Sequence, residues 1–223
     1  MNTNCIGLMF SMIYIGLILI LAYLLKKKTK VKDEFVRKTI HILTANWWII
    51  LVNYFDNILF AIAGPICFVF FNSLFVFYPN VGEKIGCPNK KRNLGLVYYP
   101  FSVLILVLWV YTDVITLYAA TIGVFAMGYG DGFAAIFGSL WGKKRIPLPT
   151  GGKTYFGSIV MLIVCVISSF VVLSVMTNFS INDKLLISII VGVSAAFLEV
   201  VTPLGLDNIS VPLLTALLVG GLF

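Results

Sequence analysis

The residue best placed to do chemistry is an aspartate set among glycines. Asp131 has Gly128, Gly130 and Gly132 around it and stands near the end of an apolar run. A carboxylate at membrane depth costs about 2.5–3.5 kcal/mol on insertion scales, so such a group usually faces a protein cavity and has a function. The glycines allow the backbone to approach a ligand closely and argue against a plain helix. We therefore expect a glycine-broken helix that exposes Asp131 to a water-filled cavity.

A second glycine cluster follows and could bind an anion. Gly151 and Gly152 precede Lys153, and Gly157 and Ser158 follow it at the start of an apolar run. Free backbone amides at a helix start attract anions, and a lysine adds a point charge. The spacing differs from that of a Walker P-loop, which also needs a preceding strand. Together, the acid and the glycine–lysine loop could hold a metal ion and phosphate groups.

The third group of polar residues enters an apolar run near residue 39. Glu34, Arg37, Lys38 and His41 are spaced i, i+3, i+4 and i+7, which places them on one face of a helix. One interpretation is a site for phosphates. The alternatives are a basic patch that touches anionic lipid, and a packing role for the histidine.

A fourth group lies near the carboxyl end of the chain. Glu199 falls inside the end of an apolar run, and Asp207 and Asn208 precede the last one. An N-cap role would account for Asp207 or Asn208, but it would not account for Glu199.

The elements that must position these residues are membrane helices. Sixty per cent of the 223 residues are hydrophobic, 11 per cent are charged, and the mean hydropathy is +1.03. A soluble core could not bury so much apolar surface. We predict an all-α polytopic bundle of seven long transmembrane helices and a short eighth. It forms one domain over 1–223, in which 1–33 is the first helix with a basic linker and 34–223 is the catalytic bundle. The apolar runs are 6–25, 39–55, 58–78, 96–112, 114–138, 156–177, 185–202 and 209–223.

The distribution of positive charge predicts the topology. Fifteen of the 16 basic residues fall in alternate loops, after the first, third and fifth runs, and Lys184 is the exception. Basic loops stay in the cytosol, so the amino terminus is expected outside and the four polar groups at the cytosolic side. The net charge of +7 therefore requires no nucleic acid as a partner.

Taken together, these segments resemble the CTP-dependent lipid-alcohol kinases, which include dolichol, phytol and farnesol kinases and the fungal CTP-using diacylglycerol kinase. The resemblance begins near residue 34 and covers most of the chain. Where family members often carry a doubled acid before the asparagine, this chain has Leu206-Asp207-Asn208. The matching elements, in the family's order, are Glu34-x-x-Arg37-Lys38-x-x-His41, Leu94-Gly95-x-x-Tyr98-Tyr99-Pro100, Gly130-Asp131-Gly132 with Gly138, Lys153-x-x-x-Gly157-Ser158, and Glu199 with Asp207-Asn208-x-x-Val211-Pro212.

The resemblance implies CTP as the phosphate donor, a lipid alcohol as the acceptor and Mg²⁺ or another divalent cation as the cofactor. Phosphoryl transfer needs positioning and charge neutralisation, which carboxylates holding a metal and basic groups on the phosphates can supply. The expected catalytic residues are Asp131, Lys153, Arg37 and Lys38, and the expected metal ligands are Asp131, Glu199 and Asp207. The expected binding residues for substrate or nucleotide are Glu34, His41, Tyr98, Gly130, Gly132, Gly151, Gly152, Gly157, Ser158 and Asn208.

Two other classes of function remain open at this point. A phosphatidate cytidylyltransferase-like enzyme would use the same metal and phosphate groups to make a CDP-lipid. A transporter for an anionic solute would carry polar residues near the midplane of several helices, whereas here they gather at one side. The identity of the lipid alcohol and the oligomeric state do not follow from the sequence.

Overall fold

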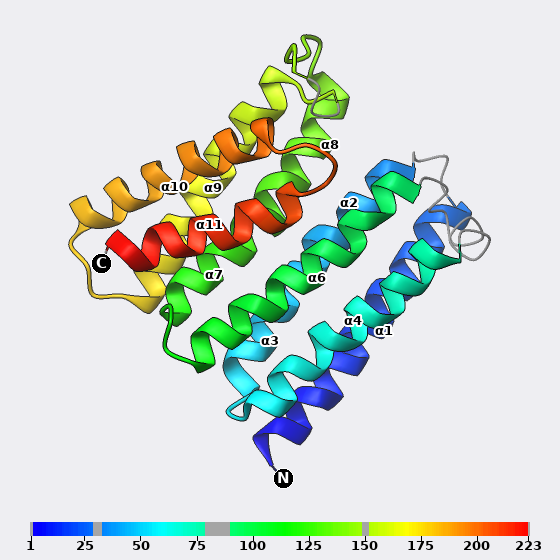
Figure 1. Cartoon of the computed structure of the whole chain (residues 1–223), viewed down its shortest axis with the longest axis vertical. Coiled ribbons are helices and arrows are strands. Elements are labelled where there is room, and N and C mark those ends of the chain that lie inside the picture. Colours follow the sequence, from blue (N-terminus) through cyan, green and yellow to red (C-terminus); the bar gives the residue numbers. More distant parts are fainter. Residues whose placement is uncertain (1, 29–32, 79–89, 149–151, 223) are drawn as a thin grey trace.

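The chain folds into helices that run side by side along one diagonal of the view in Figure 1. The structure is a computed structural model that describes residues 2–28, 33–78, 90–148 and 152–222. Within these residues there is no β-strand, and a single β-bridge joins Arg145 to Thr154. The elements are α1 (Thr3–Lys28), α2 (Asp33–Ala45), α3 (Trp47–Tyr54), α4 (Ile58–Phe77), α6 (Lys90–Tyr111), α7 (Leu117–Phe125), the π-helix η1 (Ala126–Asp131), α8 (Gly132–Trp141), α9 (Tyr155–Met176), α10 (Ile181–Val201) and α11 (Asp207–Leu222).

Several of these helices are long and apolar enough to cross a membrane, as a multi-pass membrane protein requires. Among the described residues five segments qualify, and two shorter apolar helices, Ile58–Leu74 and Asp207–Gly221, accompany them. The predicted count of seven long helices is therefore not confirmed. The five segments are Thr3–Lys27, Leu94–Tyr111, Leu117–Trp141, Tyr155–Met176 and Ile181–Val201.

The apolar run 39–55 accounts for part of the difference, because it forms two helices. Around Asn46 the backbone hydrogen bonds change to a three-residue spacing. The Asn46 amide donates to the Leu43 carbonyl at 3.0 Å, and the Ile49 amide donates to the Asn46 carbonyl at 3.0 Å. The Asn46 side chain does not cap α3 but accepts a hydrogen bond from the Tyr129 hydroxyl. Helix α2 thus ends next to the residue whose side chain contacts Tyr129 of another helix.

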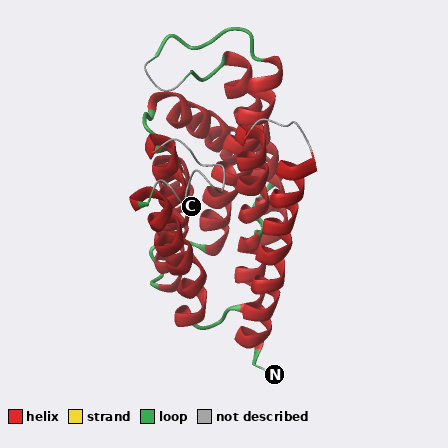
Figure 2. Ribbon diagram, turned by 90° about the vertical axis from the view of Figure 1, so that its right-hand side faces the viewer, coloured by secondary structure: helices red, strands yellow, loops and turns green. Residues whose placement is uncertain are grey.

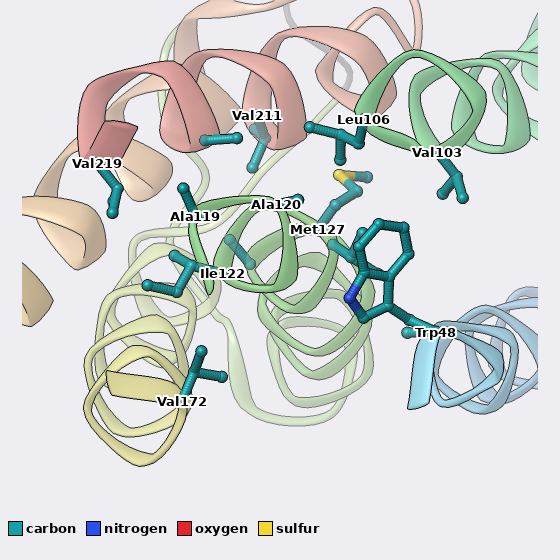
Figure 3. Packing of buried hydrophobic residues seen from close by; sticks show 14 of the residues in the cluster. Trp48, Val103, Leu106, Ala119, Ala120, Ile122, Met127, Val172, Val211 and Val219 are labelled. Atoms are coloured by element: carbon teal, nitrogen blue, oxygen red, sulfur yellow. The ribbon is translucent and has the colours of Figure 1, made fainter. Parts of the chain in front are cut away.

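The segment that carries Asp131 lies at the centre of the bundle. An 18-residue window within Leu117–Trp141 is 72% buried inside the protein, compared with 17% for the corresponding window in α1. Figure 3 shows Ile122 and Met127 of this segment with Trp48 of α3, Leu106 of α6 and Val211 of α11 around them. The Trp48 indole donates to the Thr121 hydroxyl at 2.9 Å, which satisfies its polar atom inside the core. The central segment is therefore held on several sides.

The four polar groups lie toward one end of the bundle. The starts of α2 and α6, the connection between α8 and α9 and the turn between α10 and α11 occupy the same end in Figure 1, and the chain's amino terminus lies at the other. Figure 2 shows the same helices from the side, with the amino terminus again far from the α8–α9 connection. Helix α6 begins at Lys90, six residues before the apolar run 96–112. The structure thus gathers the predicted polar groups at one end.

Candidate active site

The predicted polar face of α2 divides into two pairs of contacts. Lys38 is buried and forms an ion pair with Asp131 of η1. The His41 Nε2 lies 3.3 Å from the Met127 carbonyl and 3.7 Å from Asp131 Oδ2. A carbonyl only accepts, so a hydrogen bond to it requires the proton on Nε2. Lys38 and His41 therefore converge on the carboxylate that the sequence singles out.

Arg37 and Glu34 lie on the more exposed side of the same helix. Arg37 Nη2 is 2.6 Å from Glu34 Oε1, and about a third of each side chain is exposed. This is an i, i+3 pair of the kind that contributes only a few tenths of a kcal/mol to an isolated helix, about 0.2–0.5. Arg37 also lines a cavity with Lys38 and His41. Arg37, paired with Glu34, thus lies at the edge of the site while Lys38 is buried within it.

The glycines around Asp131 permit two neighbouring helices to pack closely on η1. A Cβ at Gly128 would lie 2.2 Å from the Ala45 Cβ of α2, and one at Gly130 would lie 2.6 Å from the Cys165 Sγ of α9. Neither approach is compatible with a larger side chain. The glycines therefore bring α2 close enough for Lys38 to reach Asp131.

The helix is not broken at these glycines, which corrects the sequence-based expectation. It continues from Leu117 to Trp141 and is wound as a π-helix over Ala126–Asp131. Wider winding keeps most backbone groups hydrogen-bonded inside the bundle, where a break would leave them without partners. Short π-helical segments occur frequently at functional sites. Asp131, the last residue of η1, is only 3% exposed.

Backbone hydrogen bonds hold the part of the α8–α9 connection that carries Lys153. The Ile146 amide donates to the Lys153 carbonyl at 2.8 Å, and the Tyr155 amide donates to the Lys144 carbonyl at 3.2 Å. Gly152 adopts a φ of 81°, a left-handed conformation that favours glycine. Gly151 lies outside the described residues. The predicted loop around Lys153 is thus a small hairpin with a glycine turn.

The predicted anion site at the start of α9 is only partly available. Thr154 caps the helix, and its Oγ1 accepts from the Gly157 amide at 3.0 Å. The Ser158 hydroxyl donates to the Thr154 carbonyl at 3.3 Å. The Gly157 amide is therefore occupied by the cap, in contrast to the free amide that we expected. Gly157 also allows close packing, since a Cβ there would lie 3.0 Å from the Ala134 carbonyl oxygen.

The Lys153 side chain reaches two acids from the end of the chain. Its Nζ contacts Glu199 Oε1 and lies 2.7 Å from Asp207 Oδ2. Burial lowers the pKa of Lys153. The negative charges of Glu199, Asp131 and Asp207 outweigh that effect and raise it above its ordinary value. Lys153 is consequently protonated at neutral pH, and Asp131 is near enough to raise its pKa.

A tight turn places Glu199 and Asp207 beside each other. It joins α10 to α11 through Leu204 and Gly205, which have φ values of 60° and 80°. The Thr202 and Ser210 hydroxyls on its two sides are 2.9 Å apart. Asn208 follows directly and donates from Nδ2 to the Gly205 carbonyl at 3.0 Å. The turn therefore fixes both acids and the asparagine as one unit.

Three carboxylates and two ammonium groups meet in this region, which leaves one negative charge in excess. The carboxylates are those of Asp131, Glu199 and Asp207, and the ammonium groups are those of Lys38 and Lys153. Glu199 Oε2 is buried without a hydrogen-bond partner. Within the described part of the chain, no three His, Cys, Asp or Glu side chains lie close enough to hold a metal ion by themselves. The predicted trio is thus not a ready-made metal cage.

Of the adjacent tyrosines Tyr98 and Tyr99, the structure places Tyr99 beside His41. Tyr99 is buried, and its ring centroid is 4.4 Å from that of His41. Tyr98 is half-buried and is not among the residues that line the cavity beside His41. Thr44 and Trp47, which also line this cavity, were missed. They follow His41 at successive intervals of three residues, and this spacing was the signal that could have identified them.

Comparison with known proteins tests the resemblance to the lipid-alcohol kinases. No family model matches the chain, and no solved structure matches it significantly. The phytol kinase of Synechocystis sp. (strain ATCC 27184 / PCC 6803 / Kazusa) is 27% identical to it over 213 residues, which cover 92% of this chain and 86% of that protein. The resemblance to the lipid-alcohol kinases is confirmed. The match extends over nearly the whole of both chains.

Proposed function

We propose that the protein is a kinase that transfers the terminal phosphate of CTP to the hydroxyl of a membrane lipid alcohol. The observation that carries the proposal is that two ion-paired clusters lie at one end of a membrane bundle. In one, Asp131 pairs with Lys38, and in the other, Lys153 pairs with Glu199 and Asp207. The similarity to a phytol kinase over nearly the full length supports a lipid alcohol as acceptor. CTP as donor follows from the family resemblance.

The reaction balances without any further reactant. The hydroxyl oxygen of the lipid forms a bond to the terminal phosphorus of CTP, the bond from that phosphorus to the bridging oxygen breaks, and CDP leaves. The hydroxyl proton is released. Such a transfer relies on positioned positive charge around the phosphates. Arg37, Lys38 and Lys153 would supply it, with Tyr98, Asn208 and the glycines at positions 151 and 152 completing the nucleotide site.

The residues present fit a divalent cation. All three carboxylates offer hard oxygen ligands, the cluster carries an excess negative charge, and Glu199 Oε2 is buried without a partner. Mg²⁺ is usually held by one or two carboxylates plus substrate phosphates rather than by a full protein cage. Glu199, Asp207 and Asp131 would hold it, and when bound it would neutralise charge on the phosphates. Lys153 and Lys38 would then pair with phosphate oxygens in place of the carboxylates.

The positive-inside rule supports a site that faces the cytosol and an amino terminus outside the cell. The bundle has its polar groups at the end opposite the amino terminus (Figure 1). CTP is a cytosolic nucleotide, so this orientation agrees with the proposed donor.

The test is product analysis with protein purified in detergent. The protein is incubated with radiolabelled CTP, Mg²⁺ and either a lipid alcohol or phosphatidate. A kinase yields CDP and a lipid phosphate, and this is the expected result. Release of pyrophosphate with phosphatidate would instead show a cytidylyltransferase. Turnover of neither, with uptake of an anionic solute into vesicles, would show a transporter.

A further inference from the structure

We infer that one unbranched or isoprenoid chain of the acceptor alcohol lies in a cavity beside the active site, and that Trp47 closes the deep end and sets the chain length accepted. This inference rests on the proposed function and specifies its acceptor. The cavity has a volume of about 250 Å³ and lies between α1, α2, the start of α3, α4 and α6. Its walls are predominantly apolar, as those of lipid sites are.

The residues along α2 give the cavity a polar end and an apolar end. Lys38, His41, Thr44 and Trp47 line it at intervals of three residues. At a rise of 1.5 Å per residue, the stripe extends over roughly 14 Å. The hydrocarbon core of a bilayer is about 30 Å thick, so the cavity spans about the depth of one leaflet. It thus has the depth and polarity that a lipid in a single leaflet would need.

Two other walls show the same gradient. On α1, Lys26 lines the polar end and Leu19 lies two turns deeper. On α4, Asn72 is at the polar end, and Pro65 is deeper. Because the gradient recurs on α1 and α4, it is not confined to α2.

The polar end opens onto the candidate active site. Lys38, which lines the cavity, is the ion-pair partner of Asp131. Asn208 also lines it and adjoins Asp207, the partner of Lys153. An alcohol whose tail lies along α2 would therefore present its hydroxyl group between the two ion-paired clusters. This is the position that an attacking hydroxyl must take.

Trp47 closes the deep end of the cavity, and contacts on two sides hold its indole in place. The Nε1 donates to the Ser11 hydroxyl of α1 at 2.8 Å. On the α4 side, a Cβ at Gly64 would lie 2.7 Å from the Trp47 Cζ2, so Gly64 allows the ring to pack against the α4 backbone. The ring is buried. A longer chain cannot pass it without displacing these contacts.

The volume favours one chain over two. Typical pockets for drug-sized ligands measure about 300–1,000 Å³, and this cavity lies below that range. Diacylglycerol would have to place two chains in it, whereas a prenyl alcohol places one. We therefore assign single-chain alcohols as the acceptor class.

The test compares chain-length profiles of purified variants. The parent, Trp47→Leu, Trp47→Phe and the control Trp141→Leu are assayed with geraniol, farnesol, geranylgeraniol, phytol, a long polyprenol and diacylglycerol. Trp141 is 62% exposed and lies on α8, away from the cavity. We expect Trp47→Leu to raise the ratio of activity on the longest to that on the shortest accepted prenol about tenfold. Trp47→Phe should give a smaller shift, and Trp141→Leu none.

The outcomes separate this inference from the proposed function. If the parent phosphorylates no alcohol, the proposed function fails. If the parent is active but Trp47→Leu and Trp47→Phe keep its chain-length profile, or if diacylglycerol is the preferred acceptor, the inference fails alone. A prenol with a photoreactive group at its tail end provides a readout without turnover. It should label peptides of α3 and α4 in the parent, and labelling confined to α9 and α10 would overturn the assignment.

Discussion

Lys38 and Asp131 are 93 positions apart in the sequence, yet they form a buried ion pair at the centre of the candidate active site. The pair depends on close packing between α2 and η1, which the glycine at position 128 allows. A buried pair of this kind can be purely structural, because breaking one half of it is costly whatever its function. The predictions below therefore measure folding and activity separately.

The first prediction concerns the charge of Asp131. Asp131→Asn removes the carboxylate charge but keeps an oxygen that can accept from Lys38. Loss of a group that stabilises developing charge typically reduces turnover by about a hundredfold or more. We expect at least that loss in the kinase assay, with the protein still folded by circular dichroism and size exclusion. Near-normal turnover would exclude Asp131 from the site.

A double variant serves as its structural control. Lys38→Met with Asp131→Leu removes both charges, and replacing a whole buried pair by apolar residues is often neutral or stabilising. We expect thermal stability close to that of the parent and no kinase activity. Recovery of activity together with stability would show that the pair has only a structural role.

The second prediction concerns the packing of η1. At Gly128 an added methyl group would meet Ala45, so Gly128→Ala must push α2 away from η1. Overpacking of this kind typically costs about 1–3 kcal/mol. Activity should fall further than stability because Lys38 moves from Asp131. The matched control is Gly16→Ala in α1, where nothing lies within 4 Å of the new methyl group. That variant should be as active as the parent, and equal effects of the two would contradict the prediction.

The third prediction concerns pH and Lys153. Its folded-state pKa lies above the ordinary value of 10.5, because nearby carboxylates outweigh burial. The stabilisation it contributes is thus fully present below about pH 10.5 and is lost as the pH rises through the folded-state pKa. The difference in unfolding free energy between the parent and Lys153→Met, measured in detergent, should be about 3–5 kcal/mol and constant from neutral pH to about 10. Above about pH 10.5 the difference should decline, and a difference that stays constant there would show that the pKa of Lys153 is not raised. Lys27→Met, in the exposed part of α1, is the control and should show little difference at any pH.

The fourth prediction concerns the nucleotide. Arg37→Ala and Lys153→Ala should each weaken CTP binding, because each removes a cation proposed to contact phosphate. Lys27→Ala should not, since Lys27 is exposed and its Nζ lies 5.4 Å from the centre of the Tyr23 ring. Binding is measured in one neutral detergent, where attraction to acidic lipid is absent. If all three variants bind CTP like the parent, the phosphate site lies elsewhere.

The fifth prediction concerns orientation in the membrane. A cysteine introduced by Thr150→Cys should react with an impermeant reagent only after the membrane is opened. One introduced by Asp113→Cys, at the other end of the bundle, should react in intact cells. Labelling of the first in intact cells would reverse the proposed topology. The background for both lacks the native cysteines Cys5, Cys67, Cys87 and Cys165.

Local patterns were sufficient to predict much of this site. The i, i+3, i+4 and i+7 spacing correctly placed Glu34 and His41 on one helix, since helical periodicity is a property of neighbouring residues. The high cost of an acid in an apolar run singled out Asp131 as a functional candidate, and the structure buries it against Lys38. These inferences needed no knowledge of distant contacts.

Features that depend on distant contacts were not predictable. The end of α2 at Asn46 is accompanied by a hydrogen bond from Tyr129, and the π-winding of η1 by close contacts with Ala45 and Cys165. Each partner belongs to another helix. Likewise, nothing local distinguishes Tyr98 from Tyr99, because only the position of His41 across the interface makes Tyr99 the inner one.

The turn between α10 and α11 limits which insertions and deletions the protein can accept during evolution. Glu199 and Asp207 stand at its two sides, and its path depends on the left-handed conformations of Leu204 and Gly205. The spacing of the two acids therefore depends on the conformation of this turn. A one-residue insertion or deletion between positions 202 and 206 would leave every membrane span intact and still separate the acids from Lys153. Proteins with a longer or shorter turn should thus still insert into the membrane and fold, but selection on activity should eliminate them.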